Sequence, residues 1–132
     1  MITTKGRYAL RIMLDLAECE PGRFIALKDI ADRQELSKKY LEIIARDLVK
    51  GKLIEGSSGK NGGYRLNRTP EEYPIGEILE KMEGTLAPVA CLAEDAEECT
   101  RKSYCKTLPL WTEYYKLERD FFYGKTLADL LV

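Results

Sequence analysis

Apolar residues recur at intervals of three and four positions in four segments of the chain, which is the period of an amphipathic α-helix. The first predicted helix begins at Thr3 or Thr4, either of which can cap it, and extends to about Ala17. Three further helices are predicted over 38–50, 74–83 and 108–123. Their apolar stripes, in chain order, are Ala9, Ile12, Met13 and Leu16; Leu41, Ile44, Ala45 and Leu48; Ile75, Ile78, Leu79 and Met82; and Leu110, Trp111, Tyr114, Leu117 and Phe121, widened by Tyr115 and Phe122.

A short helix over 26–34 precedes the helix over 38–50, and only a few turn residues separate the two. The pair Pro21-Gly22 ends the first helix before this unit, and Gly51 ends the second helix of the pair. Ser37 stands where an N-cap is expected, and two lysines follow it. Two short helices joined by a tight turn predict a helix-turn-helix unit.

The segment 52–66 has the pattern of a β-hairpin, because two apolar runs enclose a tip rich in Gly, Ser, Lys and Asn. The tip could instead bind phosphate, but no Gly-Lys-Ser/Thr sequence ends it and no helix follows it. A hairpin directly after a helix-turn-helix is a wing. The sequence therefore predicts a mainly α fold with a small β-hairpin wing, that is, a winged helix-turn-helix domain followed by a long C-terminal helix.

Charge is distributed unevenly along the chain. Residues 1–68 carry 14 Lys and Arg against 9 Asp and Glu, whereas residues 69–132 carry 7 against 13, so the two parts have net charges of +5 and −6. We expect 1–68 to bind a polyanion and 69–132 to serve another purpose within one compact domain. No apolar run approaches the roughly 20 residues that span a bilayer, so no membrane partner is expected.

Three of the four cysteines, Cys91, Cys99 and Cys105, follow a CX7CX5C pattern in an acidic segment that is poor core material. The sequence opens at Met1 with no charged region followed by an apolar one, so we expect a cytoplasmic protein with reduced thiols. Zinc usually takes four side-chain ligands, and the chain has no histidine. An iron-sulfur cluster is therefore favoured over zinc, redox thiols or inert cysteines. Cys19 ends an apolar helix and is interpreted as a small buried residue.

Several motifs together carry a family resemblance. They are KGRYALRIMLDLA at 5–17, SKKYLE at 37–42, GKNGGYRL at 59–66, IGEILEKMEG at 75–84, and the three cysteines followed by Leu110-Trp111. In this order they resemble the IscR-type (Rrf-two) family of bacterial winged-helix transcription regulators over nearly the whole chain. The resemblance implies a homodimer held by the C-terminal helix, an iron-sulfur cluster on the preceding loop, and a palindromic double-stranded DNA operator.

The resemblance also implies a set of DNA-binding residues. The helix that would enter the major groove begins with Ser37, Lys38, Lys39, Tyr40 and Glu42. The wing tip, suited to the minor groove or the DNA backbone, offers Ser58, Lys60, Asn61, Gly62 and Gly63. Lysines at a helix N-terminus neutralise phosphates, whereas a carboxylate such as Glu42 can accept a hydrogen bond from cytosine N4. Tyr40 has two interpretations, a phosphate-contacting hydroxyl or a partly buried ring.

The chain departs from the family around the cluster. Family members with a two-iron cluster commonly have a histidine three residues after the last cysteine, where this chain has Leu108. Others take a carboxylate from the partner's first helix, near a position occupied here by Tyr8. A 2Fe-2S cluster is favoured and a 4Fe-4S cluster stays open. The fourth ligand is expected to be an exogenous thiol, a water, or an oxygen of Glu94, Asp95, Glu97, Glu98 or Thr107.

These observations predict a homodimeric transcription regulator, a repressor of iron-sulfur assembly or of iron and redox genes, that senses through a cluster on Cys91, Cys99 and Cys105. An enzyme with a small-molecule substrate is not expected. One alternative is a cluster-free regulator of sulfur or cysteine metabolism with the same fold. Another is a small redox or metal-carrier protein, which would have no use for a basic recognition helix and wing.

Overall fold

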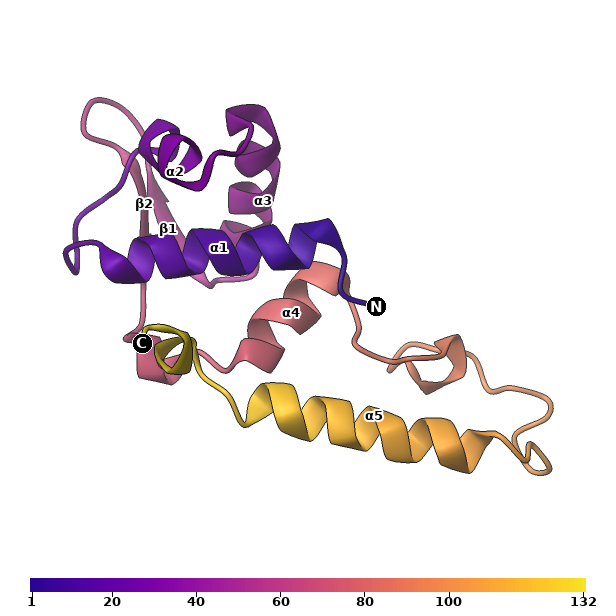
Figure 1. Ribbon diagram of the computed structural model, residues 1–132. Helices are drawn as coiled ribbons and strands as arrows, with labels where there is room; N and C mark the ends of the chain where they lie inside the picture. Colours follow the sequence, from indigo (N-terminus) through magenta and orange to yellow (C-terminus); the bar gives the residue numbers. More distant parts are fainter.

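The computed structural model describes residues 1–132 and confirms the predicted mainly α fold with a hairpin wing (Figure 1). In chain order the elements are α1 (Thr4–Glu18), α2 (Leu27–Gln34), α3 (Lys38–Lys50), β1 (Ile54–Ser57), β2 (Gly63–Leu66), the 3-10 helix η1 (Pro70–Glu72), α4 (Ile75–Glu83), η2 (Ala90–Leu92), α5 (Leu108–Tyr123) and η3 (Leu127–Leu130). In Figure 1, α2, α3 and the hairpin lie on one side of α1, whereas α4 and α5 lie on the other.

Helix α1 is the centre of the packing. Its stripe of Ala9, Ile12, Met13 and Leu16 is buried, and the helix contacts α2, α3, β2 and α4. A single cluster of 21 buried apolar residues therefore includes the stripes of α3 and α4 together. Each large aliphatic side chain in it contributes about 1.5–3 kcal/mol through burial. No helix is both long enough and apolar enough to cross a membrane.

The buried carboxylate of Asp15 on α1 binds the helix-turn-helix, a contact that the sequence pattern did not indicate. Asp15, the one charged residue in the core, accepts two hydrogen bonds from Arg33 at 3.1 and 2.7 Å and one from Gln34 at 2.9 Å. Arg33 and Gln34 are the last residues of α2. A buried carboxylate without partners costs several kcal/mol, so this set of bonds fixes the end of α2 against α1.

The wing is held by the pairing of its own two strands and by backbone hydrogen bonds to the segment before α2. Strands β1 and β2 pair antiparallel, with Ile54 opposite Leu66 and Ser57 opposite Gly63. On the other edge of β2, Tyr64 exchanges two backbone hydrogen bonds with Ile25, at 2.8 and 2.9 Å. The segment before α2 therefore acts as a third, one-residue strand that anchors the wing to the helix-turn-helix.

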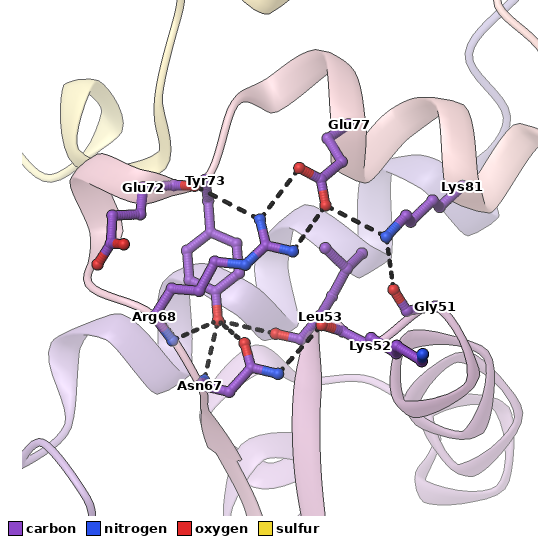
Figure 2. A network of polar contacts seen from close by, with 9 residues as sticks. All are labelled: Gly51, Lys52, Leu53, Asn67, Arg68, Glu72, Tyr73, Glu77 and Lys81. Atoms are coloured by element: carbon purple, nitrogen blue, oxygen red, sulfur yellow. Dashed lines mark hydrogen bonds and ion pairs between the residues drawn. The ribbon is translucent and has the colours of Figure 1, made fainter.

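Tyr73, immediately before α4, carries a hydroxyl group inside the protein (Figure 2). The hydroxyl accepts hydrogen bonds from the backbone N–H groups of Asn67 and Arg68, at 3.0 and 3.1 Å. Its single proton can be donated to Leu53 O at 2.8 Å or to Asn67 Oδ1 at 2.9 Å. Burial raises the pKa of Tyr73, which keeps the hydroxyl protonated. It thus joins the start of β1, the end of β2 and the approach to α4.

An ion-pair group reinforces the same junction (Figure 2). Arg68 binds both carboxylate oxygens of Glu77 on α4, at 3.0 and 2.8 Å. Lys81, one turn further along α4, donates to Glu77 at 3.2 Å and to the carbonyl oxygen of Gly51 at the end of α3. The hydrogen bonds from Arg68 lower the pKa of Glu77. Helix α4 is therefore tied both to the base of the wing and to the recognition helix.

Helix α5 packs loosely on this body. Gly76 of α4 allows Tyr123 to come close, because a Cβ at that glycine would lie 2.3 Å from Cδ2 of the ring. After α5 the chain returns to the core, where Leu127 is buried and its N–H bonds to Tyr73 O at 2.9 Å. No residue of α5 itself is buried.

We predict that Tyr73→Phe lowers the free energy of unfolding by about 2 kcal/mol, because it leaves buried backbone groups without their partner. Urea titration of both proteins measures the difference. Tyr104→Phe is the matched control, since Tyr104 is 61% exposed and its hydroxyl makes no hydrogen bond, and its effect should stay below about 0.5 kcal/mol. Equal stabilities of Tyr73→Phe and the wild type would contradict the role of the hydroxyl.

Candidate nucleic-acid interface and cysteine loop

The start of α3 has the exposed, basic character expected of a recognition helix. Ser37 caps the helix, and its side-chain oxygen accepts a hydrogen bond from the N–H of Tyr40 at 3.4 Å. Lys38, Lys39 and Glu42 are all exposed. The opposite stripe of the helix is buried in the core, so these side chains are held outward by packing.

A broad hollow of about 900 Å³ lies between α3 and the wing. It brings together five of the predicted DNA-binding residues, namely Lys38, Glu42, Ser58, Gly62 and Gly63. Ser37, Lys39, Tyr40, Lys60 and Asn61 are exposed but do not line it. Helix and wing therefore form two walls of one concave surface, which includes half of the predicted residues.

Two basic residues on this surface were missed by the sequence interpretation. Arg46 lies one helical turn beyond Glu42, and Lys28 lies in the first turn of α2. Both are exposed and line the hollow. Arg46 could have been found by extending the outward stripe of α3 past its first turn. Lys28 had no comparable signal, because only the tertiary fold brings α2 beside the wing.

The backbone of the hairpin requires glycine at positions 62 and 63, which the sequence did not indicate. Gly63 has φ +149° and a Cβ there would lie 2.1 Å from the carbonyl oxygen of Ile25. A Cβ at Gly62 would lie 2.4 Å from the carbonyl oxygen of Ser57. The two glycines therefore let the hairpin tip close and let β2 approach the Ile25 segment. Their contact with DNA stays a prediction.

Tyr40 has a partly buried ring. It is 36% exposed, and its ring packs edge-on against that of Tyr8 on α1, with centroids 5.7 Å apart. The guanidinium of Arg11 lies 5.4 Å from the centroid of the Tyr8 ring. This small cluster fixes the first turn of α3 against α1 and leaves the phenolic edge of Tyr40 accessible.

The cysteine loop, residues 85–107, connects α4 to α5, and in Figure 1 it runs beside α5 and then beyond the N-terminal end of that helix. Its three cysteines are reduced, with Cys91 and Cys99 exposed and Cys105 half-buried. All three line one hollow of about 370 Å³. The other lining residues are Leu92, Ala96, Glu97, Glu98, Lys102 and Leu108. The fold thus brings three cysteines separated in sequence around one space.

In this structure the three cysteines are not gathered around a single metal ion. No three Cys, Asp or Glu side chains lie close enough together to hold one metal ion. Thiolates on one tetrahedral zinc lie roughly 3.8 Å apart, since each Zn–S bond is about 2.3 Å. An iron-sulfur cluster binds thiolates through separate iron atoms and accepts them further apart. Three cysteines around one hollow offer the type of ligand that such a cluster takes.

Cys105 is the cysteine best prepared to act as a thiolate. Its sulfur lies 3.4 Å from Oγ1 of Thr107, the N-cap of α5. Hydrogen bonds from the Thr107 side chain and from the backbone of Thr107 and Leu108 lower the pKa of Cys105. The N-terminus of α5 thus favours the charged form of the sulfur, which is the form that binds metal.

The acidic residues of the loop divide into two groups. Glu97 and Glu98 line the cysteine hollow, whereas Glu94 and Asp95 face a different hollow together with Glu80 of α4. Arg119 of α5 binds the second group only, 3.1 Å from Glu80 Oε2 and 3.9 Å from Glu94 Oε1.

Tyr123 completes this contact by donating to Glu80 Oε1 at 2.6 Å. Burial and this hydrogen bond raise the pKa of Tyr123 to about 12, so the phenol stays a donor. Arg119 and Tyr123 together connect α5 to α4 beside the cysteine loop.

Cys19 lies at the C-terminal end of α1, remote from the cysteine loop (Figure 1). It packs against the core, and its thiol donates to Asp15 O at 3.2 Å. Burial raises the pKa of Cys19, which disfavours the thiolate. The sequence interpretation as a small buried residue is thus confirmed only in part, since Cys19 packs against the core but is half-buried.

Comparison with known proteins assigns the chain to one group. The family described as Rrf2, iron-dependent transcriptional regulator, matches residues 2–132. The chain is 38% identical over 130 residues to protein rrf2 of Nitratidesulfovibrio vulgaris, covering 98% of the chain and 86% of that protein. The structure of CymR, the global cysteine regulator of B. subtilis, superposes with a TM-score of 0.77 at 35% identity, covering 98% of this chain and 95% of that one. T. potens IscR superposes with a TM-score of 0.74 at 33% identity, covering 99% and 85%.

Proposed function

Because this chain belongs to the Rrf2 family of DNA-binding transcription regulators, we propose that it is a homodimeric repressor whose DNA binding responds to an iron-sulfur cluster on Cys91, Cys99 and Cys105. The genes under its control are those of iron-sulfur assembly or of iron and redox metabolism. The observation that carries the proposal is the single hollow lined by all three cysteines. In the cluster, iron and sulfide would supply reversible redox chemistry and sensitivity to iron supply.

A fourth ligand is proposed from the two carboxylates that share this hollow. Glu97 and Glu98 line it with the cysteines, whereas Glu94 is drawn toward Arg119. This geometry favours Glu97 or Glu98 over the other loop carboxylates. A carboxylate binds iron in a thiolate-rich site less firmly than a thiolate does, which suits a sensor that must lose or change its cluster.

The structure offers a physical route from the loop to the DNA-binding surface. Arg119 contacts Glu94 on the loop and Glu80 on α4. On the neighbouring turn of α4, Glu77 holds Arg68 at the base of the wing (Figure 2). A shift of the loop would thus act on α4 and through it on the spacing between wing and recognition helix. We propose this chain of contacts as the coupling path.

A second candidate is a cluster-free regulator of cysteine metabolism. The observation in its favour is the superposition with CymR, which is as good as the superposition with IscR. A shared fold does not determine the ligand of a loop, so the cysteines themselves must decide between the two.

We predict that protein purified anaerobically is brown and contains iron and acid-labile sulfide. Alanine at Cys91, Cys99 or Cys105 should each remove the colour and the bound iron, because each substitution deletes a soft ligand. Cys19→Ala is the matched control and should retain both, since Cys19 lies at the far end of α1. Absorption spectra with iron and sulfide analysis measure the outcome. A wild type that stays free of iron and sulfide after anaerobic reconstitution would favour the cysteine regulator.

We predict different effects for two neighbours on α3. Lys39→Ala should weaken binding to all duplexes alike and reduce the salt dependence of log K by about 0.9 per lost phosphate contact. Glu42→Ala should instead widen the set of accepted sequences, because a carboxylate discriminates through the base edges. Selection from a random duplex library, followed by titration at several salt concentrations, distinguishes these results. A uniform loss on every sequence for Glu42→Ala would indicate a structural role for that residue.

The proposed dimer uses the face of α5 that the monomer leaves uncovered. Leu110, Tyr114, Leu117 and Phe121 lie along one stripe and are 58%, 51%, 64% and 60% exposed. Their spacing of four, three and four residues is that of a helix-helix seam. A separate face carries Tyr115 and Phe122 against the core. Apolar stripes of this kind mark association surfaces on otherwise folded proteins.

We predict that Leu117→Lys converts the dimer to a monomer, because a charge in the middle of the apolar stripe would be buried without a partner. Thr112→Lys, at an exposed position nearly opposite the stripe on the same helix, is the control and should stay dimeric. Sedimentation velocity at micromolar concentration, together with circular dichroism to verify folding, checks both. A wild type that sediments as a folded monomer would overturn the proposed seam.

A further inference from the structure

Helix α3 carries an apolar side chain, Ile43, that is half exposed and is not among those packed against the core. Three large apolar side chains are exposed on this helix, Tyr40, Ile43 and Val49. Tyr40 packs edge-on against Tyr8, and Val49 lies beside Gly56 of the wing, where a Cβ would come within 3.8 Å of Cγ2 of the valine. Ile43 is 49% exposed and is absent from the apolar side chains packed against the core.

Ile43 lies on the outward side of α3, next to but not among the α3 residues that line the hollow between this helix and the wing. Successive residues of an α-helix are rotated by about 100°. The buried stripe of α3 is formed by Leu41, Ile44, Ala45 and Leu48. On this rotation Ile43 falls roughly 30° from the direction opposite the centre of that stripe. Lys39, one turn before it, and Arg46, one turn after it, lie together on one side of Ile43 and would approach phosphates there.

Isoleucine is an unfavourable residue for an exposed helix position that contacts nothing. Its β-branched side chain loses rotamer freedom in a helix, whereas lysine or glutamate would cost less and be solvated. The same stiffness is an advantage for contact, because one rotamer dominates before binding. In the major groove the apolar feature available to such a side chain is the C5-methyl group of thymine.

We propose that Ile43 is a specificity-determining residue that contacts the methyl group of one thymine in each half-site. The proposal rests on the DNA binding assigned to α3 above. Glu42 and Ile43 are neighbours in sequence whose side chains diverge by about 100° around the helix. The thymine is therefore expected near, and not at, the position that Glu42 contacts.

Replacement of thymine by deoxyuridine removes the methyl group alone and tests this contact directly. Duplexes are first selected from a random library with the full-length wild type, in both its cluster-loaded and its chelator-treated form. Each thymine in the selected duplex is then replaced in turn by deoxyuridine. One replacement per half-site should weaken wild-type binding about fourfold, the effect of exposing one methyl-sized group. The others should have little effect.

Two variants separate the methyl contact from general affinity. With Ile43→Ala, the fourfold preference for thymine over deoxyuridine at that position should fall to about one. Lys39→Ala, on the same face, should bind both duplexes more weakly and keep the fourfold ratio. Circular dichroism should be unchanged for Ile43→Ala, because the side chain is exposed and alanine is a better helix former.

The outcomes distinguish this inference from the function on which it rests. If neither form of the wild type enriches any duplex, the proposed DNA-binding function fails. If a duplex is enriched but the thymine preference is absent, or is the same in the wild type and Ile43→Ala, the role of Ile43 is overturned while the function stands.

Discussion

The hydroxyl group of Tyr73 lies inside the protein, and its need for hydrogen-bond partners holds together the segments around it. It takes two N–H donors from the end of β2 and has an acceptor at the start of β1, while its own backbone leads into α4. The carbonyl oxygen of the same residue receives the N–H of Leu127 from the segment after α5. One buried tyrosine therefore holds together the wing, α4 and the C-terminal segment. The position of the wing relative to α3 depends on that junction.

The ion pairs around this junction extend it in two directions. Through Glu77 and Arg68, α4 is tied to the base of the wing, and through Glu80 and Arg119 it is tied to α5 (Figure 2 shows the first of these). The carboxylate of Glu80 is half-buried and bound from two sides, whereas Glu94 in the loop is exposed and 3.9 Å from the same arginine. The α4 contact is thus the firmer one, and the loop contact is the one that a change in the loop can readily alter.

The winged-helix part and the α5 part differ in how much apolar surface they leave exposed. The winged-helix part buries its apolar stripes and leaves mainly polar groups outside, with Ile43 the exception on the outward face of α3. The α5 part leaves a full apolar stripe exposed and places three thiols around an open hollow. A protein that binds DNA at one end and a second copy at the other has this division, because each exposed group is then covered by a different partner.

The sequence by itself determined the elements, since helical period, the Ser37 cap, the Gly-rich hairpin tip and the terminating glycines are local properties. It also indicated the exposed start of α3 and the clustered cysteines, because both are contiguous segments. Tertiary structure alone decided which residues meet. Asp15 with Arg33, Tyr73 with Leu53, and Lys28 beside the wing join positions far apart in the chain, and no periodicity encodes such pairs. The division of the loop carboxylates between two hollows likewise follows from how the loop folds against α4 and α5, which spacing along the sequence cannot specify.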